Sequence, residues 1–370
     1  MKVLFLADPS ASHTIKWVNS LSGKGLDITV FGLKEYSKPD YLELDNLRII
    51  GSGFKPELFQ KQDGSLSKLV YLKEFPRLKK IIKDFKPDIL HAHYATSYGL
   101  LGALANFHPY LISVWGSDVY NFPGRSLVHK KVFKYILSKA DRVLSTSRVM
   151  SAEVGKYSGK KIFVTPFGID LEKFFPQQVD SIFGKDDIVI GTIKTLEKKY
   201  GIEYLLQAFK ILKDKHPELP LKLLISGQGT QRDELKNLAA GLGILNDTKF
   251  TGFINHNDVP RYQNMIDIFV SLSVEDSESF GVAVLEASAC GKPVVVSNAG
   301  GLPEIVADNE TGFVVDKKNA RQAAGAIERL LLDKSLRAAM GKNGRMRAAE
   351  FYNLSDNVDQ MMKIYKEVLE

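Results

Sequence analysis

Two glutamates, Glu278 and Glu286, are the side chains whose type and spacing best suit chemistry in this sequence. Glu278 is expected in a loop just before Phe280 and Gly281, and Glu286 follows eight residues later, about two turns into a helix. Two carboxylates pointed at a phosphate would repel it. Both are therefore expected to accept hydrogen bonds from the hydroxyl groups of a sugar or a ribose.

The start of that helix is suited to an anion. The first backbone N–H groups of a helix lack internal partners and lie at the positive end of its dipole, which favours a negative group at Gly281, Val282 and Ala283. Gly281 has no Cβ, so a ligand can approach the backbone closely. A diphosphate would fit this position.

The surrounding pattern alternates strand and helix. Residues 268–273 and 294–296 are apolar runs typical of strands, and residues 280–290 have helical apolar spacing. The segment therefore predicts strand, loop, helix and strand.

This segment resembles the signature of the retaining glycosyltransferases of the GT-B fold, specifically family 4. Glu278 and Glu286 are set in ESFGVAVLEASACGKPVV, in which the flanking Phe-Gly, Leu-Glu-Ala and Cys-Gly-Lys-Pro-Val-Val also match. For the two glutamates alone, an ordinary Rossmann-type helix with two solvated carboxylates is the alternative. The resemblance implies an α/β protein of two Rossmann-like, doubly wound domains that face an interdomain cleft.

Length and composition agree with two domains. The chain has 370 residues, beyond the size at which one core usually stops growing. We expect an acceptor-side domain over residues 1–174, a nucleotide-sugar domain over residues 175–352, and a last helix within residues 353–370 that returns to the first domain.

The sequence predicts a cytoplasmic protein. The single cysteine, Cys290, cannot form an internal disulfide, which fits a reducing compartment. There is no apolar run of the length needed to span a bilayer, and MKVLFLADPS leads into a strand and loop rather than a signal peptide.

The first loop of the chain is a second candidate site, because ligands gather beyond the carboxyl ends of parallel strands. Members of the family often carry a glycine-rich loop here, whereas this chain has Ser10, Ser12 and His13. Ser12 and His13 are candidates to bind the acceptor or the donor sugar. Helix capping is the alternative for both.

Two histidines end a predicted strand at alternate positions. His91 and His93 should lie on one face of it. The resemblance implies that this His-x-His pair, and His93 in particular, lines the site, with simple packing as the alternative. A metal would need further ligands, which are not evident nearby, so no metal site is expected.

Trp115 and Asp118 follow the next predicted strand. Many relatives carry a histidine at the position of Trp115. Tryptophan cannot move protons, although it can stack on a sugar ring, so a general base is not expected there. Asp118 is a candidate to bind acceptor hydroxyls, with a turn or helix cap as the alternative.

Positive charge gathers in the N-terminal half. Residues 1–174 contain 26 Lys and Arg against 16 Asp and Glu, whereas the remainder has 24 against 27. Two predicted helices, 68–86 and 125–139, interleave basic and apolar residues. Such helices can lie on an anionic membrane, here the inner membrane face, or pack on the core with their charges in water. A nucleic-acid partner is not expected.

The C-terminal half repeats the pattern, with strands predicted at 188–193 and 221–226. Lys194 and Lys199 follow the first of these strands, where relatives place an arginine and a lysine on the donor's diphosphate. Lysine provides a point charge without the bidentate fork of arginine. The resemblance also places Gly227, Phe253, Ile254 and Phe280 at the donor.

The resemblance implies a retaining, metal-independent hexosyltransferase without a resident cofactor, because the sequence contains no Asp-x-Asp. Glu278, Lys194 and Lys199 would be catalytic and Glu286 would bind the donor. The donor would be a UDP-sugar, with GDP-mannose next, and the acceptor a glycan or lipid-linked molecule of cell-envelope polysaccharide synthesis.

Three other functions remain open at this stage. They are a nucleotide-sugar epimerase on the same fold, a two-domain dehydrogenase and a catalytically silent nucleotide-sugar or polysaccharide-binding protein. The dehydrogenase is disfavoured because no Gly-x-Gly-x-x-Gly follows the first strand of either half.

Overall fold

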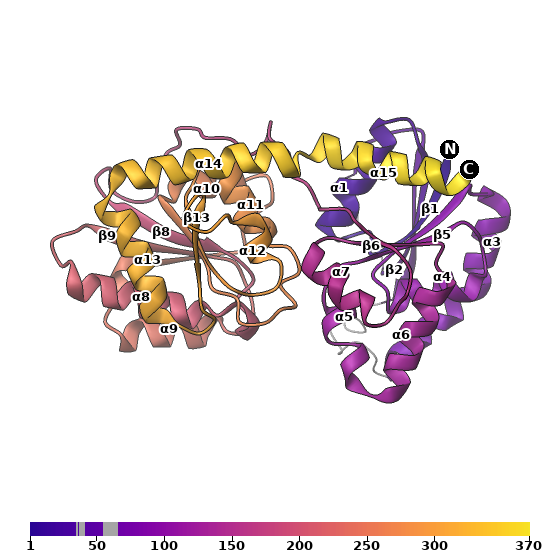
Figure 1. Ribbon diagram of the computed structural model, residues 1–370, viewed down its shortest axis with the longest axis horizontal. Helices are drawn as coiled ribbons and strands as arrows, with labels where there is room; N and C mark the ends of the chain where they lie inside the picture. Colours follow the sequence, from indigo (N-terminus) through magenta and orange to yellow (C-terminus); the bar gives the residue numbers. More distant parts are fainter. Residues whose placement is uncertain (35, 37–40, 55–65) are drawn as a thin grey trace. The chain divides into compact units, whose positions relative to one another are not determined.

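The chain forms two compact α/β units in a computed structural model, which describes residues 1–34, 36, 41–54 and 66–370, without the side chains of 66–68 (Figure 1). The N-terminal unit comprises Met1–Phe167 and Ser355–Glu370, and the C-terminal unit comprises Gly168–Leu354. Each unit is built around one parallel sheet, as expected for a Rossmann-like domain.

The N-terminal sheet has the strand order β3-β2-β1-β4-β5-β6-β7, and all of its neighbouring strands are parallel. Its strands are β1 (Lys2–Leu6), β2 (Asp27–Lys34), β3 (Leu47–Phe54), β4 (Ile89–His93), β5 (Tyr110–Val114), β6 (Arg142–Ser145) and β7 (Ile162–Val164). Its helices are α1 (Ser12–Gly23), α3 (Phe75–Phe85), α4 (Ser97–Ala105), α5 (Ser117–Tyr120), α6 (Leu127–Lys139), α7 (Arg148–Gly155) and α15 (Leu354–Leu369), with 3-10 helices η1 (Leu66–Glu74) and η2 (Pro123–Arg125).

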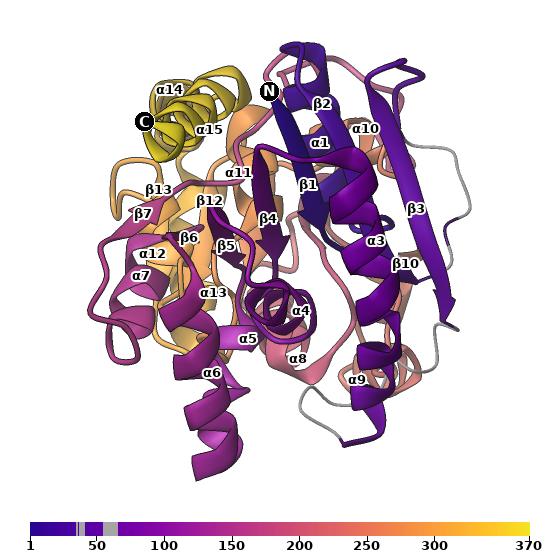
Figure 2. The ribbon, with the colours of Figure 1, turned by 90° about the vertical axis from the view of Figure 1, so that its right-hand side faces the viewer.

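Continuous apolar strands give this unit a core on each face of its sheet. In β1, Val3, Leu4, Phe5 and Leu6 are all fully buried, as expected for a strand covered on both sides. One core cluster joins alternate residues of β1 and β4 to the buried sides of α3, α4 and α6. These helices lie along one side of the sheet, away from α1 and α15 (Figures 1 and 2).

The C-terminal sheet has the order β10-β9-β8-β11-β12-β13 and is also parallel. Its strands are β8 (Ile188–Ile193), β9 (Leu221–Ser226), β10 (Thr248–Gly252), β11 (Ile268–Ser271), β12 (Val294–Ser297) and β13 (Gly312–Val315). Its helices are α8 (Ile202–Lys215), α9 (Arg232–Gly241), α10 (Val259–Met265), α11 (Val282–Ala289), α12 (Leu302–Ile305), α13 (Ala320–Leu332) and α14 (Lys334–Tyr352), with 3-10 helices η3 (Lys198–Tyr200) and η4 (Leu245–Asp247).

The order of the strands in each sheet predicts where a ligand would bind. In each sheet the direction of connection reverses once, between β1 and β4 in the N-terminal unit and between β8 and β11 in the C-terminal unit. Ligands of open parallel sheets bind beyond the carboxyl ends of the strands at such a reversal. The loops after β1, β4, β8 and β11 are therefore the positions to inspect.

The chain passes between the units twice, and the two passages are hydrogen-bonded to each other. The N–H of Ile169 donates to the carbonyl of Tyr352 at 2.7 Å, and the N–H of Leu354 donates to the carbonyl of Ile169 at 3.0 Å. The division falls after Phe167 rather than after residue 174. Residues 168–174 belong to the C-terminal unit because Arg345 there holds the carbonyl of Phe174 at 3.1 Å.

The last helix, α15, packs in the N-terminal unit through both charged and buried contacts. Tyr365 is fully buried, Gln360 donates to the carbonyl of Val164 at 3.0 Å, and Lys24 pairs with Asp359 at 2.9 Å. The structure thus contains a C-terminal segment that completes the N-terminal unit.

Two predicted helices differ from those observed. The single helix expected over 68–86 is η1 followed by α3, and the side chain of Lys68 lies outside the described residues. The helix expected over 280–290 is α11, which starts at Val282 because Gly281 adopts φ +92°. Across the parts of the chain that the structure describes, none of the helices has the length and apolarity needed to cross a bilayer.

Candidate functional sites at the sheet edges

An ion pair joins the ends of β8 and β11 in the C-terminal unit. Nζ of Lys194, the residue after β8, lies 2.6 Å from Oε2 of Glu278, which is in the loop between β11 and α11. Both side chains are largely buried, with 17% and 8% exposed. Oε2 of Glu278 also accepts a hydrogen bond from Ser273 Oγ at 3.3 Å. Two residues predicted to be catalytic are therefore in direct contact.

The surroundings of Lys194 keep its ammonium group charged. Burial alone would lower the pKa of Lys194. The attraction of Glu278, with further contributions from Tyr200 and Glu286, outweighs burial and raises that pKa above its ordinary value. The site consequently carries a fixed positive charge at neutral pH.

Lys199 and Tyr200 complete the cationic side of this edge. Nζ of Lys194 lies 4.4 Å from the centre of the Tyr200 ring and Nζ of Lys199 lies 4.9 Å from it. Both are within the range of a cation–π contact. The sequence analysis gave Tyr200 no role. Its position directly after Lys199 was the available signal.

Backbone groups of the loop after β12 donate hydrogen bonds to the loop that carries Glu278. The N–H of Gly301 donates to the carbonyl of Glu278 at 2.9 Å, and the N–H of Gly300 donates to Asp276 Oδ1 at 3.0 Å. A Cβ on Gly300 would lie 2.1 Å from the Glu278 carbonyl oxygen, and its φ is +50°. Only glycine allows this approach.

A second ion pair closes the same loop. Lys317 Nζ contacts Asp276 Oδ1 at 2.5 Å. Partial burial would raise the pKa of Asp276, but the hydrogen bonds from Lys317 and from the Gly300 N–H lower it. Asp276, Gly300 and Lys317 were not among the predicted site residues.

The start of α11 has the exposure that an anion site needs. Val282 and Ala283, in its first turn, are partly exposed. Gly281 caps the helix, and a Cβ there would lie 2.5 Å from Leu302 Cδ2. Local packing and its positive φ therefore already require this glycine, apart from any ligand.

Phe280 and Glu286 lie differently from what the sequence suggested. The Phe280 side chain is only 3% exposed and packs edge-on against Tyr352 at 5.6 Å, so it is a packing residue. Glu286 is the fifth residue of α11, little more than one turn from its start, and it is 7% exposed.

Gly227 and Phe253 follow β9 and β10 at the same edge of the sheet. A Cβ on Gly227 would lie 1.9 Å from the carbonyl oxygen of Lys194, so this glycine lets two loops pack together. The Phe253 side chain is 71% exposed, and Ile254 is partly exposed. Phe253 is available for stacking on a planar ring.

The corresponding edge of the N-terminal unit carries a group of aromatic rings. His13 stacks on Phe167 with centroids 3.8 Å apart and an interplanar angle of 11°, and it meets Trp115 edge-on at 5.8 Å. His93 lies 4.7 Å from Trp115. The structure thus brings together His13, His93 and Trp115. It adds Phe167, which was not predicted.

The two strand histidines share one face, as predicted, with ring centroids 4.8 Å apart. His91 is fully buried and bonds Tyr365 Oη through Nδ1 at 2.7 Å and Ser113 Oγ through Nε2 at 2.8 Å. Burial lowers the pKa of His91 to about 3. Its contacts make it a structural residue.

His93 differs from His91 in its polar contacts. It is 2% exposed, and among the described residues its Nδ1 has no hydrogen-bond partner. Burial, with His91 and His13 nearby, lowers the pKa of His93 well below its usual value. The ring is therefore neutral at physiological pH.

Asp118 holds the backbone beneath these rings. Its carboxylate is fully buried and accepts from the N–H groups of Ala95 at 2.8 Å, Gly116 at 2.8 Å and Trp115 at 3.2 Å. These contacts favour the turn alternative over direct binding of an acceptor. Ser12 is exposed on the first turn of α1 and does not cap it.

The chemistry of the C-terminal edge is that of an anion and hydroxyl site. It combines two cations and a helix amino end with two buried carboxylates. Within the described ranges, no three His, Cys, Asp or Glu side chains are grouped so that they could hold a metal ion.

Two family models match this chain. The model described as "Glycosyl transferases group 1" matches residues 175–347, and the one described as "Glycosyl transferase 4-like" matches residues 2–147. The matches fall on the C-terminal and N-terminal units respectively.

The chain is similar to two proteins that are named by their activities. The chain is 29% identical to the GDP-mannose-dependent alpha-(1-6)-phosphatidylinositol monomannoside mannosyltransferase of Mycolicibacterium smegmatis, over 73% of this chain and 74% of the relative. It is also 29% identical to the N,N'-diacetylbacillosaminyl-diphospho-undecaprenol alpha-1,3-N-acetylgalactosaminyltransferase of Campylobacter jejuni, over 86% of this chain and 87% of that relative.

Among solved structures, the sucrose-phosphate synthase of Thermosynechococcus elongatus is similar with a TM-score of 0.83 at 22% identity, covering 99% of this chain and 98% of that one. This likeness confirms the predicted GT-B class of fold.

Proposed function

The chain belongs to the group 1, family 4-like glycosyltransferases, and from this premise we propose that it is a retaining enzyme that transfers a sugar from a nucleoside diphosphate sugar. The observation that carries the proposal is the Lys194–Glu278 pair at 2.6 Å, set at the strand reversal of the C-terminal sheet. It combines a fixed cation with a carboxylate that can accept hydrogen bonds from hydroxyl groups.

In the proposed donor complex, Lys194 and Lys199 contact the diphosphate. The N–H groups at the start of α11, from Gly281 to Ala283, supply further positive potential. As the bond between the sugar and the diphosphate breaks, negative charge grows on the phosphate oxygens. Cations and N–H groups already in place stabilise that charge without reorganising, which is usually the largest contribution to such a reaction.

The two carboxylates bind hydroxyl groups in this proposal. Glu278 accepts from the transferred sugar, and its contact with Lys194 orients it. Glu286 accepts from the ribose. Phe253 and Ile254, at the end of β10, contact the base, for which the exposed Phe253 ring offers a stacking surface.

We propose that the acceptor attacks from the face that the diphosphate leaves. The acceptor oxygen forms a bond to the anomeric carbon while the bond from that carbon to the phosphate oxygen breaks. The proton of the acceptor hydroxyl passes to a phosphate oxygen of the leaving group. This route retains configuration and requires neither a resident cofactor, a metal ion nor a general base at Trp115.

A lipid-linked acceptor is the one we favour over a free glycan. The names of the two relatives specify a phosphatidylinositol monomannoside and a diphospho-undecaprenol sugar, both of which are lipids. His13, His93 and Trp115 in the N-terminal unit are the residues proposed to meet its sugar. The reaction would serve cell-envelope polysaccharide synthesis on the cytoplasmic side of the membrane.

A ligand panel followed by a transfer assay tests this function. Thermal unfolding with UDP, GDP, ADP and their sugars should show stabilisation by one nucleotide series, with the UDP series expected first and GDP-mannose second. The wild-type protein should then transfer sugar to a lipid-linked acceptor with retention of the anomeric configuration. The Glu278→Ala variant should lose this transfer.

Other outcomes of that assay would contradict the proposal. Isomerisation of the donor in the absence of acceptor would indicate an epimerase. Nucleotide-sugar binding with neither transfer nor donor hydrolysis would indicate a binding protein, the alternative suggested by Trp115 and the altered loop after β1.

A further inference from the structure

An apolar pair is exposed at the amino end of α6. Leu127 and Val128 are 78% and 67% exposed, whereas Phe133, Ile136 and Leu137 on the same helix are fully buried. Packing against the core therefore explains the apolar residues in the later turns of α6. The apolar side chains of its first turn remain unburied.

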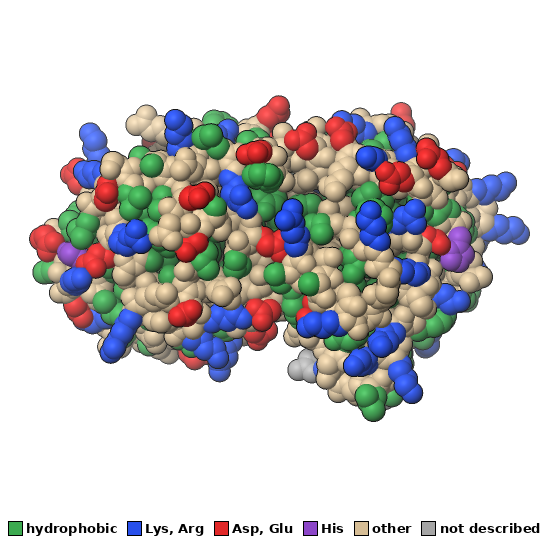
Figure 3. All heavy atoms as spheres, viewed as in Figure 1, with side chains coloured by type: hydrophobic (Ala, Val, Ile, Leu, Met, Phe, Trp, Pro, Cys, Tyr) green, Lys and Arg blue, Asp and Glu red, His purple; other side chains and the backbone are tan. Residues whose placement is uncertain are grey.

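Exposed cations surround this apolar pair. Residues 119–140 contain no Asp or Glu. In Figure 3 the end of the N-terminal unit that carries α6 shows hydrophobic side chains with Lys and Arg next to them. We define the α6 tip as the exposed apolar and basic residues at this end, which are Arg125 of η2 and Leu127, Val128, Lys130, Lys131 and Lys134 of α6.

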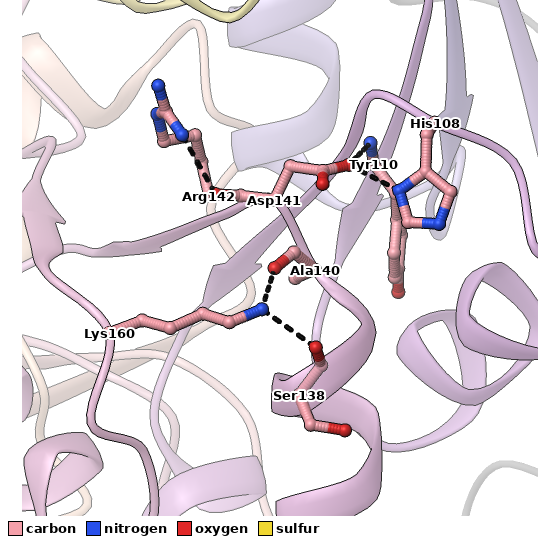
Figure 4. Close-up of polar contacts among 7 residues, drawn as sticks. All are labelled: His108, Tyr110, Ser138, Ala140, Asp141, Arg142 and Lys160. Carbon is pink, nitrogen blue, oxygen red and sulfur yellow. Dashed lines mark hydrogen bonds and ion pairs between the residues drawn. The ribbon is translucent and has the colours of Figure 1, made fainter.

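The opposite end of α6 is fixed to the sheet (Figure 4). Nζ of Lys160 donates to the carbonyls of Ser138, at 2.7 Å, and Ala140, which suits a cation at a helix carboxyl end. Just beyond, Asp141 Oδ2 accepts from the N–H of Tyr110 at 2.7 Å. These contacts fix where the tip points.

Topology places the tip near the acceptor residues. Because β5 and β6 are parallel, the segment between them must return from the carboxyl edge of the sheet to the amino edge. The start of α6 thus lies toward the edge where β5 ends, and residues 116–126 alone separate it from Trp115.

We propose that the α6 tip docks on an anionic lipid bilayer, with Leu127 and Val128 among the acyl chains and the surrounding cations against the headgroups. The inference rests on the proposed function in one respect, because docking there would present a lipid-linked acceptor to the edge that carries Trp115. Charge complementarity and an unburied apolar pair are the features of a membrane-surface helix.

The other basic helix, α3, does not share these features. Its apolar residues Phe75, Ile81, Ile82 and Phe85 are partly buried and pack against the core, while Lys80 and Lys83 are exposed. It is a surface helix with charges in water. The docking proposal therefore concerns α6 alone.

Charge reversal on the two helices provides a matched comparison. The full-length protein would be sedimented with vesicles of phosphatidylcholine, with and without phosphatidylglycerol, at low and high salt. Lys131→Glu with Lys134→Glu should weaken binding to the anionic vesicles by at least about tenfold, since each cation near such a surface contributes roughly fivefold. Lys80→Glu with Lys83→Glu should leave it unchanged.

Insertion of the apolar pair is tested separately. The chain has one cysteine, Cys290, which is buried, so Leu127→Cys can be labelled selectively with an environment-sensitive dye. The dye should shift to shorter wavelength with anionic vesicles, and the same dye on Lys80→Cys should not. Leu127→Ser with Val128→Ser should reduce binding without changing the net charge.

These measurements separate the two proposals. Equal binding by both charge-reversal variants, or the same spectrum at both labelled positions, would overturn docking by the α6 tip. Sugar transfer to a detergent-solubilised acceptor should remain at the wild-type rate in the tip variants. If transfer is absent in the wild type while vesicle binding persists, the proposed function fails and the docking surface stands.

Discussion

Nζ of Lys194 and Oε2 of Glu278 lie 2.6 Å apart and join the two strand ends at which the C-terminal sheet reverses its direction. Each charge balances the other in a largely buried place. In the proposed donor complex, the diphosphate would bring negative charge to Lys194 and the sugar would bring hydroxyl groups to Glu278. Each side chain would then exchange one partner for another, so that no further charge would be buried without a partner.

Removal of the Lys194 charge should impair transfer far more than removal of a nearby cation. Lys194→Ala is expected to lower kcat/KM by about 10²–10³-fold, the usual effect of deleting one donor that stabilises transition-state charge. Lys198, in the adjacent 3-10 helix, is exposed, and Lys198→Ala is the control that should leave kcat/KM unchanged. Similar losses in both variants would contradict a specific role for Lys194.

Gly300 should be essential for holding the Glu278 loop. Gly300→Ala places Cβ 2.1 Å from the Glu278 carbonyl oxygen at a positive φ, so the loop must move. We expect a loss of about 1–3 kcal/mol in the free energy of unfolding and a larger proportional loss of activity. Denaturant unfolding and steady-state kinetics would measure both.

The matched control for this change is Gly325→Ala. Gly325 lies exposed in α13, and a Cβ there would meet nothing within 4 Å. Alanine should stabilise the helix by about 0.5–1 kcal/mol and leave activity unchanged. An active Gly300→Ala enzyme would show that the contact between the two loops is dispensable.

The buried histidines should make stability depend on pH. The native state keeps His91 neutral down to a pH of about 3, whereas an unfolded histidine binds a proton from its ordinary pKa of 6.5. Between these values the unfolded state holds more protons. Stability should therefore fall as pH falls, by up to about 1.4 kcal/mol per pH unit for this residue.

Urea unfolding at a series of pH values below neutrality would measure this slope. His91→Gln should reduce it, and the lowered pKa of His93 should account for part of what remains. His108→Gln is the control, because His108 is exposed beside Asp141. A slope unchanged by His91→Gln would mean that its burial does not govern acid sensitivity.

Trp115 should govern the use of acceptor. Its ring packs near His13 and His93, and stacking on a sugar is worth roughly a factor of ten. Trp115→Ala should raise the KM for acceptor by about that factor, and Trp115→Phe by less. The donor's dissociation constant, measured by calorimetry, should not change. An effect on donor binding alone would contradict the proposed role of Trp115 in binding the acceptor.

The sequence predicted the fold class and several strands because their signals are local. Residues 188–193 and 221–226 coincide with β8 and β9, since continuous apolar runs identify strands that are buried on both faces. The start of α11 was placed two residues early, because apolar spacing does not reveal that Gly281 adopts a positive φ.

The candidate site was predictable only as a set of residues. Sequence motifs identified Lys194 and Glu278, but their contact depends on how loops from two strands fold back toward each other. Asp118 illustrates the opposite limit. An aspartate two residues after a glycine suits either a ligand or a turn, and only the fold shows that three backbone N–H groups donate to its carboxylate.

The burial of His91 beneath Tyr365 bears on how this protein is made. The ribosome delivers the histidine well before the tyrosine, because the whole C-terminal unit is synthesised between them. The part of the N-terminal sheet that α15 covers must therefore stay uncovered while that unit emerges. A chain released before α15 is made should be prone to aggregation.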